Sequence, residues 1–117
     1  KGLKIGLATS SYSILIDTIL DTLAIRHYFD TVHSAEHEQF GKPHPAVYLT
    51  AANALGIDPR QCLVVEDSLN GVISGKAARM TVLCVPEKTH FPEPKLILAD
   101  KQFDNLNEVV TYFKENL

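Results

Sequence analysis

The feature that most constrains the fold is a set of three short apolar runs, which lie far apart in the chain. They cover residues 4–9, 62–65 and 81–85. None alternates strictly between apolar and polar residues, as a strand with one face in solvent would. Each run is therefore predicted to be a strand buried on both faces, which is typical of a parallel sheet.

Segments of helical periodicity separate these runs. Residues 13–24 place apolar side chains at the three- and four-residue spacing of an amphipathic helix, and Ser10, Ser11 or Ser13 is available to cap it. A closing helix is predicted over residues 106–117. A brief strand at 31–34 and loops at 41–45 and 86–94 complete the expected pattern.

Glycines have different roles in two further predicted helices. Residues 46–55 are rich in alanine, and Gly56 is expected to end that helix in a left-handed conformation. The helix that begins at Leu69 contains Gly71 and Gly75, and each lowers helix propensity by about 1 kcal/mol relative to alanine. We therefore expect another group to approach this helix closely. Strands that alternate with helices predict an α/β fold with a parallel sheet.

Composition excludes several classes of protein. The 117 residues are enough for one domain, expected to cover residues 1–117, and the net charge of −3 favours neither nucleic acid nor another polyanion as partner. No apolar run approaches the ~20 residues of a membrane span. Cys62 and Cys84 each lie in an apolar run, which favours buried thiols and the cytoplasm. Because the chain opens in a strand-like run without methionine, we expect that a segment preceding Lys1 is missing.

Polar residues gather where the predicted strands end. Thr9 and Ser10 follow the first strand, Glu66 and Asp67 follow the second, and Lys42 lies in a proline-rich loop. Taken singly, these could be a helix cap, first-turn acids and a solvated lysine. Taken together, a hydroxyl, free N–H groups, an ammonium and two carboxylates can bind a phosphate and Mg²⁺. Because ligands bind outside the carboxyl ends of parallel strands, the pattern predicts a phosphoryl-transfer site there.

Three stretches resemble motifs of the haloacid dehalogenase-like (HAD) hydrolases, in the subfamily of the β-phosphoglucomutases and the 2-deoxyglucose-6-phosphate or hexitol-phosphate phosphatases. They are IGLATSS, FGKPHPAVYLTAANALGIDP and CLVVEDSLNGVISGKAA, and the resemblance covers residues 3 to about 86. It implies a three-layer Rossmann-like core. It also implies a phosphatase that hydrolyses a small sugar or polyol phosphate through an aspartyl-phosphate.

The resemblance also implies roles for single residues. Thr9 would bind the transferring phosphoryl group, with the Ser10 backbone beside it, and Lys42 would stabilise charge on the phosphoryl oxygens. Thr9 and Lys42 are thus the predicted catalytic residues of this chain.

The family's metal and substrate sites carry over in the same way. Asp67 would bind Mg²⁺ directly or through water, with Glu66 as the second acidic ligand. Ser68 would cap the following helix, and Asn70 would lie near the substrate. The expected ligand is a small phosphorylated metabolite.

One departure from the family is large. Family members begin with a strand ending in Asp-x-Asp, which supplies the nucleophile and the general acid, and no two aspartates of this chain are separated by a single residue. The cap domain that follows that strand is also absent. The chain is therefore predicted to be an incomplete HAD core that is inactive by itself. A phosphosugar mutase and a non-catalytic phosphate-binding or assembly fragment remain as alternatives.

The absent strand has a structural consequence. In the family it lies between the strand that ends at Thr9 and the strand that ends at Glu66. Without it, two half-sheets would face each other with unpaired edges, and exposed edges favour aggregation. We therefore expect that a further segment, a second chain or a direct re-pairing of the two strands must complete the sheet.

Overall fold

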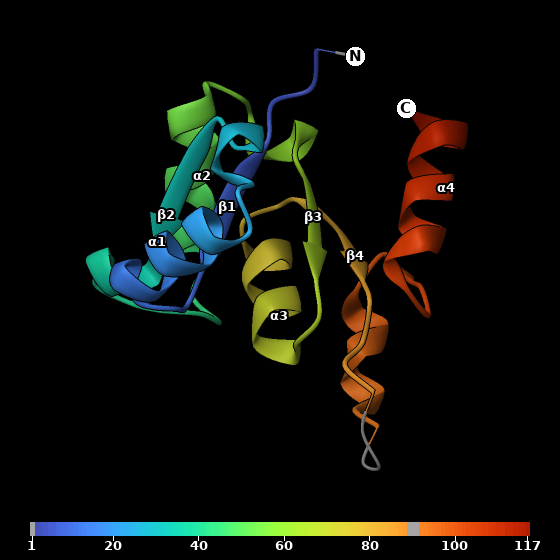
Figure 1. Ribbon diagram of the computed structural model, residues 1–117. Coiled ribbons are helices and arrows are strands. Elements are labelled where there is room, and N and C mark those ends of the chain that lie inside the picture. Colours follow the sequence, from blue (N-terminus) through green and yellow to red (C-terminus); the bar gives the residue numbers. More distant parts are fainter. Residues whose placement is uncertain (1, 89–91) are drawn as a thin grey trace.

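Helices and strands alternate along the chain in the computed structural model, which describes residues 2–88 and 92–117 (Figure 1). The strands are β1 (Gly6–Thr9), β2 (Thr31–Ser34), β3 (Leu63–Glu66), β4 (Thr81–Cys84) and β5 (Lys101–Gln102). The helices are α1 (Ser13–Thr22), α2 (Ala46–Leu55), α3 (Leu69–Ala77) and α4 (Leu106–Asn116). The predicted α/β class is confirmed. The sequence pattern did not reveal β5 or the 3₁₀ turn at Pro94–Leu98, and residues 89–91 of the expected loop lie outside the described residues.

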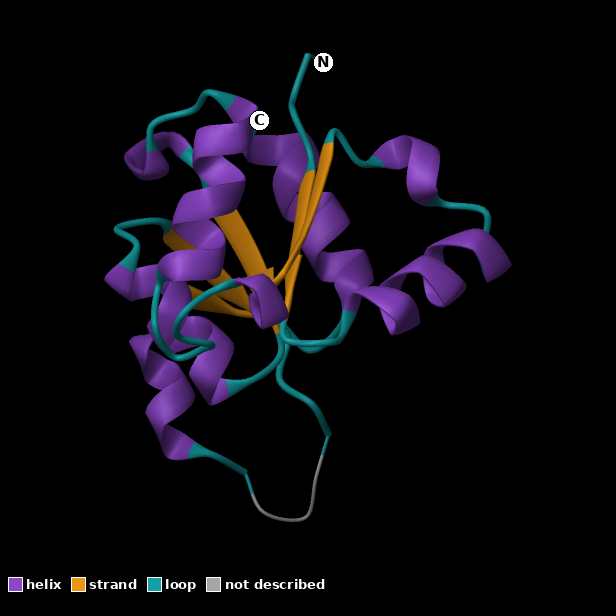
Figure 2. Ribbon diagram, turned by 90° about the vertical axis from the view of Figure 1, so that its left-hand side faces the viewer, coloured by secondary structure: helices purple, strands orange, loops and turns teal. Residues whose placement is uncertain are grey.

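The strands form two separate parallel sheets. In the first, β1 pairs with β2, from Gly6 opposite Thr31 to Thr9 opposite Ser34. In the second, β4 lies between β3 and β5, and Glu66 stands opposite Cys84. Within the described residues, β1 and β3 share no ladder, so each presents an unpaired edge. The two expected half-sheets are therefore present, and Figures 1 and 2 show them flanked by helices.

The core lies mainly on the second sheet and beneath α2 and α3. Val47 on α2, Val72 on α3 and Val82 on β4 are completely buried. A methyl group added at Gly75 would lie 2.7 Å from a methyl carbon of Val82, so the glycine allows α3 to pack closely on β4. This close approach confirms what the glycines of the third helix indicated.

Two helix ends have the caps that the sequence predicts, and one has a different cap. Gly56 ends α2 with φ = 70°, and the Ser68 side chain accepts the Gly71 N–H at the start of α3, both as expected. None of the three candidate serines caps α1. Its N-cap is Tyr12, and the first-turn N–H of Ser13 donates to Glu36 Oε2 at 3.0 Å. The cap is thus supplied by a segment 23 residues further along the chain.

Among the described residues, no helix has the length and apolar character that crossing a bilayer requires.

Candidate functional site

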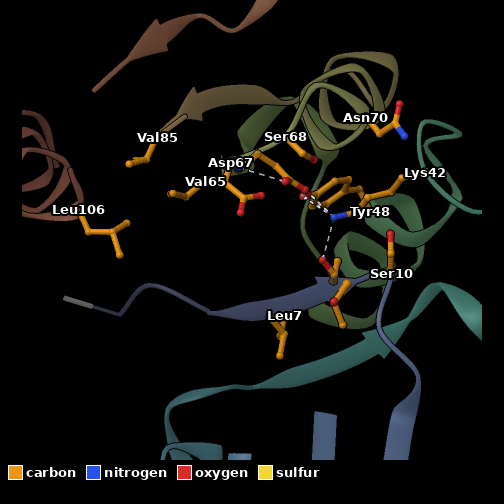
Figure 3. Close-up of a pocket in the computed structure, with 13 residues that line it drawn as sticks. Leu7, Ser10, Lys42, Tyr48, Val65, Asp67, Ser68, Asn70, Val85 and Leu106 are labelled. Atoms are coloured by element: carbon orange, nitrogen blue, oxygen red, sulfur yellow. Dashed lines mark hydrogen bonds and ion pairs between the residues drawn. The ribbon is translucent and has the colours of Figure 1, made fainter. Parts of the chain in front are cut away.

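A cavity of about 580 Å³ opens where the carboxyl ends of β1 and β3 face each other (Figure 3). Because β1 ends at Thr9 and β3 ends at Glu66, the polar residues that follow each strand border the same space. All six predicted site residues line the cavity: Thr9, Ser10, Lys42, Glu66, Asp67 and Asn70. Their proposed roles stay predictions, but the geometry brings them to one rim.

Lys42 bridges the two half-sheets. Its ammonium donates to the Ala8 carbonyl at the end of β1 at 3.2 Å and to Glu66 Oε2 at the end of β3 at 2.5 Å. The side chain of Lys42 is only 10% exposed, and that of Glu66 is 7% exposed. A charge removed this far from water requires a partner, and Glu66 provides it.

Glu66 is held from three sides. Oε2 accepts hydrogen bonds from Lys42 and from the hydroxyl of Tyr48, while Oε1 lies 3.3 Å from the backbone nitrogen of Asp67. On the fourth side is Gly71, where a methyl group would lie 1.9 Å from the carboxylate carbon of Glu66. The glycine at this position of α3 therefore makes room for the carboxylate.

The rim on the β1 side is built from hydroxyl groups and backbone. Thr9 Oγ1 accepts the Ser11 N–H at 3.1 Å, which leaves the hydroxyl proton of Thr9 free to donate. Ser34 at the end of β2 donates to the Ser11 carbonyl at 2.6 Å and fixes the turn that follows β1. The turn can therefore present a hydroxyl and backbone N–H groups to an anion.

The carboxylates suit a hard cation. Asp67 is exposed and lines the cavity, and the carboxylate of Glu66 lies beside it. Within residues 2–88 and 92–117 there is no cluster of three or more His, Cys, Asp or Glu side chains that could enclose a metal. Mg²⁺ is commonly held by one or two carboxylates together with water and substrate phosphate, so this donor pair fits it.

The sequence pattern missed Tyr48 and the apolar part of the cavity. Figure 3 shows Tyr48 next to Lys42, while Val65, Val85 and Leu106 lie on the other side of the cavity. Tyr48 occupies a position on α2 that matches the apolar period of a core helix, so its residue type was the only available signal. Burial first, and the Glu66 charge second, raise the pKa of its phenol well above the ordinary value.

The two cysteines lie outside the cavity lining, and neither forms a disulfide. Cys84 is buried as expected, whereas Cys62 is only partly buried. Burial raises the pKa of both thiols, and the nearby carboxylates raise it further. Both groups therefore stay protonated near neutral pH and are poor nucleophiles.

Known proteins resemble this chain over most of its length. Residues 1–79 match the family model of the haloacid dehalogenase-like hydrolases. Hexitol phosphatase B of Escherichia coli K12 is 41% identical over 109 residues, which cover 93% of this chain and 49% of that protein. Fructose-1-phosphate phosphatase YqaB of the same organism is 38% identical over 80 residues, covering 68% of this chain and 43% of that protein.

The fold agrees with these sequence matches. The crystal structure of β-phosphoglucomutase from Clostridium difficile superposes with a TM-score of 0.81 at 30% identity, covering 97% of this chain and 48% of that structure. This chain thus spans about half the length of the relatives it matches. Since the family model covers more than half of the chain and its motifs meet at one cavity, the chain belongs to the haloacid dehalogenase-like hydrolases.

Proposed function

We propose that this chain supplies the phosphoryl-binding part of a Mg²⁺-dependent phosphatase that hydrolyses a small sugar or polyol phosphate. The observation that carries the proposal is the convergence of Thr9, Lys42 and Asp67 on one cavity between two strand ends. The substrate class is supported by the names of the relatives, which are a hexitol phosphatase and a fructose-1-phosphate phosphatase.

Each side chain has a distinct task in this proposal. The Thr9 hydroxyl, whose oxygen already accepts the Ser11 N–H, donates a hydrogen bond to a phosphoryl oxygen. The ammonium of Lys42 offsets the negative charge of the phosphoryl group. Ser10 and Asn70 contact the phosphate and the rest of the substrate from the cavity rim. Positioning and electrostatic stabilisation are most of what phosphoryl transfer requires of a protein.

Asp67, with Glu66 as the second ligand, would hold the Mg²⁺ ion. When bound, the ion neutralises charge on the phosphoryl oxygens. In this structure Glu66 Oε2 accepts from Lys42 and Tyr48, whereas Oε1 accepts the backbone N–H of Asp67 at 3.3 Å, so Oε1 is the less engaged oxygen of Glu66.

We also propose that the nucleophilic aspartate comes from one further strand, which enters between β1 and β3 and belongs to a segment or second chain outside this sequence. The two facing strand edges have no ladder partner within the described residues, and Leu7 and Val65 flank the space between them. The 117 residues alone are then expected to self-associate, because unpaired edges are templates for pairing. A clean monomer with a sharp cooperative melt, seen by size-exclusion chromatography and calorimetry, would contradict this.

The test of the activity uses the full-length protein with an aryl phosphate and a panel of hexose and hexitol phosphates. Lys42→Met and Asp67→Asn should each lower turnover by about 10³-fold. Lys95→Met and Asp17→Asn, which alter exposed residues outside the cavity, should leave turnover unchanged. Retained activity in the first pair would refute the assignment.

A phosphosugar mutase is the second candidate, favoured by the likeness to β-phosphoglucomutase. The two activities differ in the fate of the phosphoryl group, which passes to water in one and to a second sugar hydroxyl in the other. Phosphorus NMR of the same reactions separates inorganic phosphate from an isomeric sugar phosphate. If neither product forms, titration of Mg²⁺ and inorganic phosphate tests the third alternative, a non-catalytic phosphate-binding protein.

We propose the cytoplasm as the compartment, because both cysteines are unpaired thiols and a reducing environment keeps them so.

A further inference from the structure

Tyr48 occupies a position that the proposed activity does not explain. It lies on α2, is only 8% exposed, and directs its hydroxyl toward the strand ends rather than toward solvent (Figure 3). The hydroxyl donates to Glu66 Oε2, and its oxygen lies 3.3 Å from Lys42 Nζ. The ammonium also lies 4.7 Å from the centre of the tyrosine ring. One side chain thus contacts both members of the buried ion pair.

These contacts leave the ion pair little freedom. Lys42 has three N–H donors, and the structure gives it three acceptors: the Ala8 carbonyl, Glu66 Oε2 and the Tyr48 hydroxyl. Glu66 cannot turn toward α3 without meeting Gly71. If the tyrosine hydroxyl were absent, Lys42 would lose one acceptor and Glu66 Oε2 would lose one donor, while the ring could remain.

We propose that Tyr48 is a positioning residue for the phosphoryl transfer proposed above: it orients Glu66, and through Glu66 it fixes the ammonium of Lys42 at the end of β1. The inference rests on the proposed function and extends it to a residue outside the strand ends. Tyr48 acts through the ion pair and makes no bond to the transferring group.

A buried neutral donor suits this task. The Tyr48 hydroxyl donates to the Glu66 carboxylate, and the side chain that carries it is buried. Hydrogen bonds from neutral donors to buried carboxylates are stronger than those between two neutral groups. Because Lys42 would act on charge that develops during transfer, its misplacement should reduce kcat more than it changes KM.

The decisive variant is Tyr48→Phe in the full-length protein, because it keeps the ring and removes only the hydroxyl. We expect kcat for the aryl phosphate to fall about tenfold or more, with KM changed by less than about twofold. Tyr28→Phe is the matched control, since Tyr28 is 62% exposed and lies outside the cavity, and it should leave kcat unchanged.

A double-mutant cycle with Glu66→Gln separates positioning from a general loss of packing. If Tyr48 acts through Glu66, the effect of Tyr48→Phe on the unfolding equilibrium constant should be at least about threefold smaller in the Glu66→Gln background. This readout needs no activity. Additive effects in the cycle, or wild-type kcat in Tyr48→Phe, would overturn the inference.

The two proposals can fail separately. A wild-type protein that turns over no phosphate ester refutes the proposed function, and with it any catalytic role of Tyr48. An active wild type whose kcat is unaffected by Tyr48→Phe refutes only the positioning role.

Discussion

Both half-sheets contribute residues to the cavity, but the two are stabilised very differently. In the three-stranded sheet, β4 is flanked on both sides, and its Val82 and Cys84 are completely buried. In the two-stranded sheet no residue of β1 is fully buried, and the neighbouring helix α1 exposes apolar side chains, with Ile14 at 79% and Leu15 at 49%. The comparison shows that the cavity rim forms although β1 and β3 share no ladder within the described residues.

Helices and a polar cluster, rather than sheet hydrogen bonds, join the two halves. Helix α2 packs on β1 and β2 and also contacts α3. The ammonium of Lys42 reaches from the Ala8 carbonyl on β1 to Glu66 on β3, and Ser74 on α3 donates to the His44 carbonyl at 2.8 Å. The same ion pair that would serve the chemistry therefore also links the half-sheets.

The largest expected effect contrasts a position in the buried core with a position on the exposed helix α1. Val82→Ala removes two methyl groups from a completely buried position and should lower the free energy of unfolding by about 2–3 kcal/mol. Ile19→Ala removes more carbon from α1, but that side chain is 44% exposed, so the loss should stay below about 1 kcal/mol. Denaturant titration of the full-length protein measures both. A cost for Ile19→Ala as large as that for Val82→Ala would show that a further segment covers α1.

A second pair of variants tests how tightly α3 packs on the three-stranded sheet. Gly75→Ala places a methyl group 2.7 Å from Val82, and the resulting overpacking should outweigh the gain in helix propensity by about 1–2 kcal/mol. Gly41→Ala is the control, because no atom lies within 4 Å of the added group. If thermal melts show Gly75→Ala to be neutral or stabilising, the packing between α3 and β4 is looser than these distances indicate.

Local sequence signals predicted the three-stranded sheet with its helix α3, and the cavity rim, well. Apolar runs identified β3 and β4, and the two glycines of α3 signalled the close approach of Glu66 and Val82. Strand ends predicted which polar residues share a cavity, because topology brings the carboxyl ends of parallel strands to one side.

Contacts between distant segments were not predictable in this way. The Glu36 cap of α1 spans 23 residues, and serines near the helix start were plausible local substitutes. Tyr48 follows the apolar period of α2, so the pattern could not distinguish a core ring from a donor to Glu66. β5 is only two residues long, which is too short for a periodic signal.

Asp100 lies beside β5, at the outer edge of the three-stranded sheet. Asp100 accepts the Val82 N–H at 2.7 Å and pairs with Lys76 at 2.8 Å. The Lys76 hydrogen bond first, and that of Val82 second, lower the pKa of Asp100. A carboxyl whose pKa falls on folding stabilises the protein above its unfolded value of about 3.9, and this contribution disappears as pH falls through the lower folded pKa.

Asp100→Asn should therefore cost about 1 kcal/mol at pH 7, since the pair is partly exposed and screened. The difference between variant and wild type should shrink below about pH 4, as the wild-type carboxyl is protonated. Melts across this pH range measure it. A difference that stays constant down to pH 2 would mean that the charge of Asp100 contributes nothing and that only its shape matters.

The smallest expected effect lies at the start of α1, beside the two-stranded sheet. Glu36 Oε2 accepts the Ser13 N–H, and His37 Nε2 lies 2.9 Å from the Ser13 hydroxyl, so the cap depends on a turn that follows β2. Glu36→Gln keeps an acceptor oxygen but removes the charge near the helix N-terminus, and should cost about 0.5 kcal/mol. Glu36→Ala removes both and should cost about 1 kcal/mol. Amide hydrogen exchange in residues 13–16 is the sharper measurement, because the loss should concentrate in the first turn of α1. Equal exchange changes in α3 would instead mean that the two half-sheets unfold as one unit. The stability of the three-stranded sheet would then depend on the two-stranded one.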